Sequence, residues 1–263
     1  MTTSARLVAA HPVKPMNAWR LERLRLTRSP RALALAGVYL LFGLLGPVMA
    51  KYMQDIIDRL GSGVQVVAPD PTPKDGLTNY ISQVSQTGLV VVVVIAAGAL
   101  NFDSRRGIST FLRTRVDDVW HLVAPRFTIN AAAAVGAYTL GTLAAWYETA
   151  LLLGSPPARV VIGGLICGSI YLVFAVAVTA ASASIARSTL GTVGFALAML
   201  AVLPILGLAA PLHPWLPSTL VSAPIALFGT STMADFASAI TVSLGATIGL
   251  LAFATSRLRR REI

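Results

Sequence analysis

The residue types that most often perform catalysis are scattered along this chain rather than grouped. The three histidines, His11, His121 and His213, are far apart, and no cluster of Cys, Asp or Glu has metal-ligand spacing. No serine–histidine pair lies within an apolar run, and the phosphate-binding pattern Gly-x-x-x-x-Gly-Lys-Ser/Thr is absent. The sequence therefore predicts no catalytic residue, no bound cofactor and no metal site, and ATP-driven work would require another chain.

The composition excludes most soluble classes of protein. The 263 residues are 55% hydrophobic and 12% charged, and the mean hydropathy is +0.72. A soluble domain usually carries about 25% charged residues, so this chain has too little polar surface to cover a particle in water. A soluble enzyme, a disordered tail and a disulfide-rich module are excluded, the last because Cys167 is the single cysteine. The sequence predicts an integral membrane protein.

Long apolar runs predict the helices that would position any site. A helix needs roughly 20 apolar residues to cross the hydrocarbon layer of a bilayer. We expect an all-α, polytopic fold with six transmembrane helices, at about residues 32–50, 87–102, 127–147, 160–184, 190–210 and 234–255. In this division the segments are a cytoplasmic N-terminal region (1–31), a transmembrane domain (32–255) and a basic cytoplasmic tail (256–263).

The distribution of basic residues predicts the orientation. With these spans, 17 of the 21 Lys and Arg residues lie on one side of the membrane and four on the other. Because Lys and Arg are retained on the cytoplasmic side, both termini are expected in the cytoplasm, in a multi-pass protein of the plasma (cell inner) membrane. The net charge of +10 is then an orientation signal, and no nucleic-acid partner is expected.

The predicted spans hold no ionisable residue near their centres, where ion-coupled carriers usually place one. Glu148 and Asp235 lie at span ends. Two small-x-x-x-small patterns, at residues 164–168 and 245–249, allow close helix approach. Packing within the chain is the favoured interpretation of both, and self-association through one of them is the alternative.

Residues 103–126 have the pattern of an amphipathic helix on the cytoplasmic side. Apolar residues recur at helical spacing: Ile108, Phe111, Leu112, Val116, Val119, Leu122 and Val123. Such a stripe must be buried against the chain's own spans, against lipid or in the groove of a partner protein.

Two further segments flank the spans. Residues 16–29 are basic and are interpreted either as a positive flank or as an interfacial helix in contact with membrane lipids through Trp19, Leu21 and Leu24. Residues 211–232 are interrupted by prolines yet largely apolar, which predicts an outer re-entrant or interfacial helical hairpin before the sixth span.

The order of these features resembles the permease, or transmembrane subunit, of a type-2 ATP-binding-cassette (ABC) exporter. The stretches that carry the resemblance are WRLE (19–22), RSPR (28–31), residues 106–112, WLPS (215–218) and LRRREI (258–263). In the cytoplasmic segment Asp103, Gly107, Phe111 and Leu112 match the family pattern, whereas Thr110 stands where Glu is usual.

The resemblance implies roles for two groups of residues. The first is a coupling helix that contacts a separate ATPase subunit, formed by Gly107, Ile108, Ser109, Thr110, Phe111, Leu112 and Arg113. The second is an outer gate in the re-entrant hairpin, formed by Trp215, Leu216, Pro217, Leu220, Leu227 and Phe228.

The implied partners are a soluble ABC ATPase that carries ATP and Mg, and a second permease, either an identical or a sister chain. The expected function is the ATP-driven export of a hydrophobic or amphipathic, drug-like or lipid-like substrate, as a transporter subunit and not an enzyme. A non-transporting membrane scaffold that recruits a cytosolic protein is the alternative, and an ion-coupled carrier is a weaker one.

Overall fold

The computed structural model describes residues 18–59, 70–101, 120–209 and 211–260, which fold into helices with no strand among them. Six helices are long and apolar enough to cross a membrane: Pro30–Met53, Pro73–Leu100, Val123–Leu152, Ala158–Ile185, Thr189–Leu206 and Met233–Arg260. The all-α class and the number of candidate spans are thus confirmed, by length and composition.

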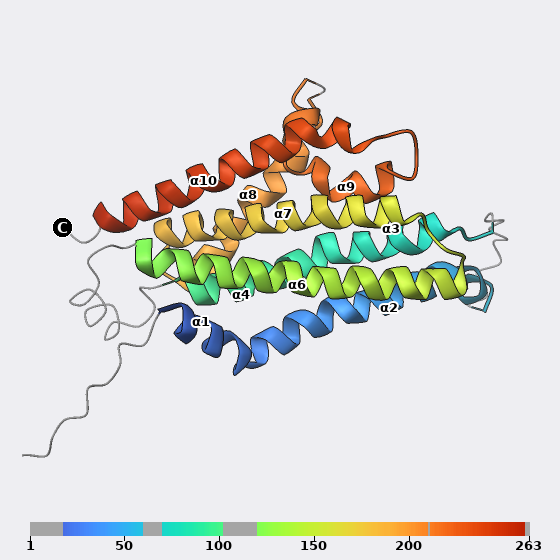
Figure 1. Ribbon diagram of the computed structural model, residues 1–263, viewed down its shortest axis with the longest axis horizontal. Coiled ribbons are helices and arrows are strands. Elements are labelled where there is room, and N and C mark those ends of the chain that lie inside the picture. Colours follow the sequence, from blue (N-terminus) through green and yellow to red (C-terminus); the bar gives the residue numbers. More distant parts are fainter. Residues whose placement is uncertain (1–17, 60–69, 102–119, 210, 261–263) are drawn as a thin grey trace, which may run out of the picture.

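The elements follow one another along the bundle shown in Figure 1. They are α1 (Ala18–Thr27), α2 (Pro30–Arg59), α3 (Pro73–Gln83), the π-helix η1 (Val84–Gly88), α4 (Leu89–Leu100), α6 (Trp120–Leu152), α7 (Ala158–Ile185), α8 (Thr189–Leu206), η2 (His213–Trp215), α9 (Thr219–Ala226), η3 (Met233–Phe236) and α10 (Ala237–Arg260). The sections α3, η1 and α4 form one continuous span.

This second span begins at Pro73, well before the expected residues 87–102, because local signals start a helix there. The Asp75 carboxylate accepts hydrogen bonds from the backbone N–H of Thr72 (2.8 Å) and from its hydroxyl (2.6 Å). Proline is favoured in the first turn, where its missing N–H has no helical partner. The same Thr-x-x-Asp signal starts the last span, where the N–H of Thr232 donates to Asp235 (2.8 Å).

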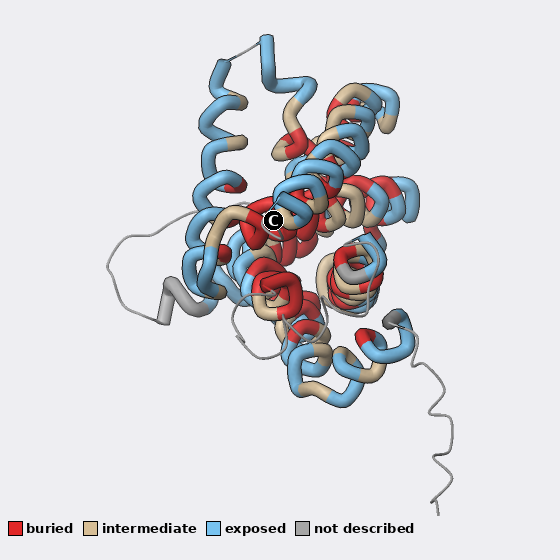
Figure 2. Tube along the Cα trace, turned by 90° about the vertical axis from the view of Figure 1, so that its left-hand side faces the viewer, coloured by how far each residue is buried: buried red, intermediate tan, exposed pale blue. Residues whose placement is uncertain are grey.

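Helix α7 lies at the centre of the bundle and packs against α4, α6, α8, α9 and α10, whereas α2 packs mainly against α6 and α3. Two apolar clusters meet along it, one with α2, α3, α4 and α6 and the other with α8, α9 and α10. The end-on view in Figure 2 shows buried residues at the centre and exposed ones on the outer helices. Buried hydroxyls of α7 are satisfied within the helix, since Thr179 donates to the carbonyl of Ala175 (2.9 Å) and Ser182 to that of Val178 (2.8 Å).

The described N- and C-terminal residues lie at the same end of the bundle, as an even number of spans requires (Figure 1). Helix α1 and the last turns of α10 are at this end, together with the end of α4 and the start of α6. The opposite end holds the end of α2, the start of α3 and the turn between α6 and α7.

Candidate functional site

A cluster of three tyrosines lies inside the bundle where α2, α3 and α6 meet. The ring of Tyr138 lies edge-on to that of Tyr39, with 6.2 Å between centroids, and stacks with that of Tyr80 at 6.4 Å. The Tyr80 hydroxyl lies 3.2 Å from the Thr142 hydroxyl and donates to the backbone carbonyl of Tyr138. These side chains place polar atoms within apolar spans.

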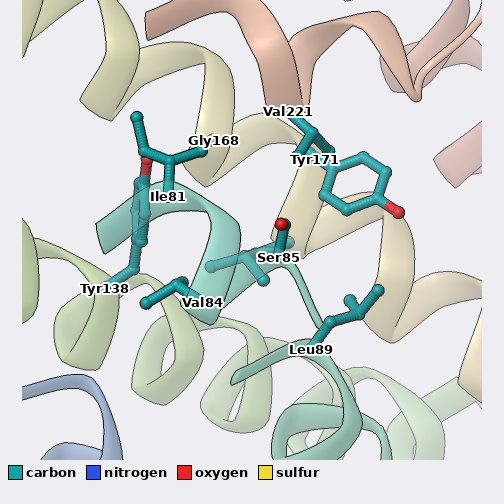
Figure 3. A pocket seen from close by; sticks show the side chains of 9 residues that line it. Ile81, Val84, Ser85, Leu89, Tyr138, Gly168, Tyr171 and Val221 are labelled. Atoms are coloured by element: carbon teal, nitrogen blue, oxygen red, sulfur yellow. The ribbon is translucent and has the colours of Figure 1, made fainter. Parts of the chain in front are cut away.

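A small cavity of about 30 Å³, partly open to the outside, lies next to this cluster (Figure 3). It is lined by Ile81, Val84, Ser85, Leu89, Tyr138, Gly168, Tyr171, Leu172 and Val221. The lining is mostly apolar, and its side-chain hydroxyls belong to Ser85, Tyr138 and Tyr171 (Figure 3). One water needs about 10–15 Å³ of such volume, so the cavity has room for a couple of water molecules in this arrangement of the helices.

The π-helix η1 brings Val84 and Ser85 to this cavity. A π turn inserts one extra residue into a helix, and such turns occur often at functional sites. The ring of Tyr39 packs directly against this turn, because a Cβ added to Gly88 would lie 3.1 Å from the ring atom Cζ. Glycine at position 88 therefore permits the contact between η1 and α2.

The residues predicted for an outer gate belong to the segment that leads into α10. They do not share one environment: Trp215 is 56% exposed, Leu220 is fully buried, and Pro217 and Leu227 are buried. Leu216 and Phe228 are half-buried. Helix α9 packs against α7 and α3, and its Val221 forms part of the cavity wall.

Two adjacent glycines allow α9 to approach α7 closely. A Cβ on Gly164 would lie 2.7 Å from the Cβ of Pro224, and one on Gly163 would lie 2.8 Å from a methyl group of Leu227. The glycine pattern at residues 164–168 therefore serves packing within the chain, which confirms the favoured interpretation. Around Gly245 and Gly249 no atom of the described chain lies within 4 Å of an added Cβ, so no such packing occurs there.

The end of the bundle that holds α1 is strongly basic. Its described basic residues are Arg20, Arg23, Arg25, Arg28, Arg31, His121, Arg126, Arg187, Arg257, Arg259 and Arg260. At the opposite end the described helices contribute Lys51, Arg59, Lys74 and Arg159. This asymmetry favours the α1 end as the cytoplasmic one.

A buried ion pair attaches α1 to α6 at the basic end. Arg126 Nε donates to the Glu22 carboxylate at 2.9 Å, and Arg126 Nη1 donates to the carbonyl of Ala99 at the end of α4 (3.3 Å). Glu22 is buried, while Trp19 and Leu21 of the predicted interfacial surface are exposed and Leu24 is half-buried. Helix α1 thus turns a charged residue toward the bundle and apolar residues outward.

The predicted coupling helix, with Gly107–Arg113, lies outside the described residues. Its described neighbours along the chain, Asn101 and Trp120, both lie at the basic end, because α4 ends and α6 begins there. Within the described ranges, no group of three or more His, Cys, Asp or Glu side chains could hold a metal ion.

Sequence reasoning missed the tyrosine cluster and the Glu22–Arg126 pair. Tyrosines within apolar runs were a usable signal, since a buried phenol requires a nearby partner or cavity. The ion pair had no local signal, because its members are 104 positions apart and Arg126 reads as an ordinary positive flank.

In comparisons with known proteins, no family model, no curated protein and no solved structure matches the chain.

Proposed function

We propose that this chain is the permease subunit of an ATP-driven exporter of the type-2 ABC class. It moves a hydrophobic or amphipathic, drug-like or lipid-like substrate out across the plasma membrane. A separate ATPase subunit binds and hydrolyses ATP with Mg, and a second permease, identical or related, forms the other half of the pathway. The chain itself catalyses no reaction.

The observation that carries this proposal is the arrangement at the basic end. The apolar stripe at residues 108–123 begins in the segment between α4 and α6, and α4 ends and α6 begins at the end of the bundle that also holds α1 and the last turns of α10. An apolar stripe on the cytoplasmic side offers a groove of a cytosolic partner something to bind. A bundle without a phosphate-binding loop requires such a partner if it is to use ATP.

The cavity beside Tyr138 supports the choice of cargo. Its apolar lining and few hydroxyls suit an amphipathic molecule, and because its volume is only about 30 Å³, the helices around it would have to part to admit a drug-sized one. Helix α9 forms part of its wall and comes close to α7 at Gly164, where a Cβ would meet Pro224. A movement of α9 away from α7 would enlarge the cavity, which is the role proposed for the outer hairpin.

The test places a charge on the stripe. Phe111→Asp is expected to abolish copurification of the proposed ATPase subunit and to reduce ATP-dependent efflux from inverted vesicles at least tenfold, because a carboxylate cannot be buried unpaired in an apolar groove. Thr114→Asp is the matched control, since position 114 is not part of the apolar stripe of the predicted helix and adds the same charge.

Four results would overturn the proposal. One is normal ATPase binding and efflux in Phe111→Asp; another is an equal loss in both variants. The third is efflux that continues without ATP and collapses with the proton gradient, which would assign the chain to ion-coupled carriers. ATPase binding without any ATP-dependent efflux would assign it to membrane scaffolds.

A further inference from the structure

The outward side of the second span is polar in its central turns. Four polar residues are exposed there at helical spacing: Ser82, Gln83, Gln86 and Thr87. They lie at the end of α3 and in the π-helix η1, whose Val84 is buried on the other side. We name these four exposed residues the amide face, after the two glutamines that dominate it.

The amide face lies near the middle of the membrane. The span Pro73–Leu100 has 28 residues, so Gln86 is about 20 Å from either end at 1.5 Å per residue. Its neighbour Ser85 lines the same cavity as Tyr171, which is the midpoint of α7. Because the hydrocarbon layer is about 30 Å thick, a glutamine side chain at this depth reaches neither surface.

The other outer spans expose apolar side chains at this depth, as contact with lipid requires. Examples near their midpoints are Leu41 on α2, Leu140 on α6, Phe195 on α8 and Ile248 on α10. The amides of Gln83 and Gln86, in contrast, form no hydrogen bond with the part of the chain that the structure describes. An amide in hydrocarbon without a hydrogen-bond partner is strongly unfavourable, so the amide face requires a polar cover.

The extent of the polar surface distinguishes a water-filled path from a contact with another helix. A path for water requires polar groups along its length. Further along the second span, toward the basic end, Val94 is 46% exposed and apolar, so the polar surface is a short patch. A short patch suits a helix–helix contact, in which glutamine and serine side chains form hydrogen bonds to the neighbouring helix.

A second copy of this chain has the chemistry to satisfy these amides. A glutamine amide both donates and accepts, so two identical amides related by a two-fold axis can form hydrogen bonds with each other. Two copies inserted with the same orientation meet about an axis along the membrane normal, which brings Gln86 to the level of its own counterpart. The amide face carries no charge, so the copies do not repel each other across it.

We propose that two copies of this chain associate through the amide face, with Gln83 and Gln86 of each copy hydrogen-bonded across the two-fold axis. The inference rests on the proposed function where that function calls for a second permease, and it assigns this place to an identical chain. Its test involves neither ATP nor substrate. Failure of the dimer and failure of the exporter are therefore distinguishable.

The experiment counts subunits by single-molecule photobleaching of the full chain in vesicles of phosphatidylethanolamine and phosphatidylglycerol. Each chain carries one fluorophore, on a cysteine added at the C-terminus in the background Cys167→Ala, and the protein-to-lipid ratio is varied. We expect monomers at low ratios and dimers, which bleach in two steps, at high ratios. Monomers at every ratio would overturn the proposal and leave a sister chain as the second permease.

Two pairs of substitutions locate the interface. Gln83→Leu/Gln86→Leu should weaken self-association at least tenfold, because it removes the hydrogen bonds but suits a surface in contact with lipid. Phe195→Leu/Met199→Leu, on the exposed side of α8, is the matched control and should change it less than twofold. A thermal melt in detergent checks that both variants are folded. Unchanged dimers in the glutamine variant, or equal losses in the two pairs, would overturn the amide face as the interface.

A second measurement tests for water at the same position. In the background Cys167→Ala, with a water-soluble maleimide on both sides of the vesicle membrane, Gln86→Cys should react at least a hundredfold more slowly than Lys74→Cys. Position 74 is exposed in the first turn of the same span. Equally fast reaction of the two variants would show that a water-filled path covers the amide face, and would overturn the proposal.

Discussion

Glu22→Gln is expected to loosen α1 from the bundle while leaving the six long helices folded. The carboxylate of Glu22 and the guanidinium of Arg126 are 2.9 Å apart, and their side chains are 7% and 11% exposed, so solvent screens the pair only weakly. Glutamine keeps the shape and one acceptor oxygen but leaves the Arg126 charge without its counterion.

The size of the effect follows from two limits. A hydrogen bond to a charged group contributes about 1.5–3 kcal/mol. Removal of one partner of a buried ion pair costs about 3–5 kcal/mol. Because Arg126 Nη1 keeps its hydrogen bond to the carbonyl of Ala99, we expect Glu22→Gln to lower the free energy of opening α1 by about 2–3 kcal/mol, near the smaller of these two limits.

Hydrogen exchange of the α1 amides in lipid nanodiscs measures this opening directly. At 1.4 kcal/mol for each factor of ten, exchange of the protected α1 amides should accelerate about 30- to 150-fold. Amides of α7 should be unaffected, since that helix lies at the centre of the bundle and takes part in both apolar clusters.

Three comparisons make this prediction refutable. Arg126→Gln should have a smaller effect, because Glu22 retains Arg25 at 3.6 Å. Glu22→Gln/Arg126→Gln should be less damaging than the sum of the single changes, since the two amides can bond to each other. Arg23→Gln, at an exposed position of α1, should leave exchange unchanged. If Glu22→Gln matched Arg23→Gln, the ion pair would not be what holds α1.

Two further changes test the packing of α9 and the cavity. Gly164→Ala places a Cβ 2.7 Å from that of Pro224, so it should destabilise the fold by about 1–3 kcal/mol in a thermal melt in detergent. Gly245→Ala, on an open face, is the control and should be neutral. Equal melting temperatures of the two variants would contradict the packing of α9 on α7. Ser85→Phe should fill the cavity beside Tyr138 and reduce efflux at least tenfold, while binding of the ATPase is retained. Val90→Phe, on the exposed side of α4, is the control and should export normally. Unimpaired efflux in Ser85→Phe would mean that the substrate takes another path.

The helices were predictable from the sequence to the extent that hydrophobicity alone defines them. Runs of apolar residues gave six spans, because each must match the thickness of the bilayer. The second span was placed too late, since its first turns, from Pro73, are polar and the signal that begins them is the short Thr72–Asp75 cap. The π turn at Val84–Gly88 has no recognised sequence pattern, and it depends on the packing of Tyr39.

The residues of the candidate sites were less predictable, because residues that are far apart in the sequence come together only in the folded chain. The face of α1 that contacts the bundle is set by Arg126, which the fold brings to Glu22 from far away. The sequence of α1 alone indicated only an apolar side, Leu21 and Leu24, for contact with lipid, and not that Glu22 would be buried. Likewise, Tyr39, Tyr80 and Tyr138 come from three different helices, so their cluster exists only in the folded bundle.

The hydroxyls of α7 that form hydrogen bonds within their own helix affect how this helix packs against its neighbours. The hydroxyls of Thr179 and Ser182 donate hydrogen bonds to carbonyls of their own helix. These residues therefore present only methyl and methylene groups to the neighbouring helices. The angle of such contacts is set by how the side chains interdigitate and not by a hydrogen bond between helices. At these two positions the packing of α7 therefore depends on the fit of apolar surface.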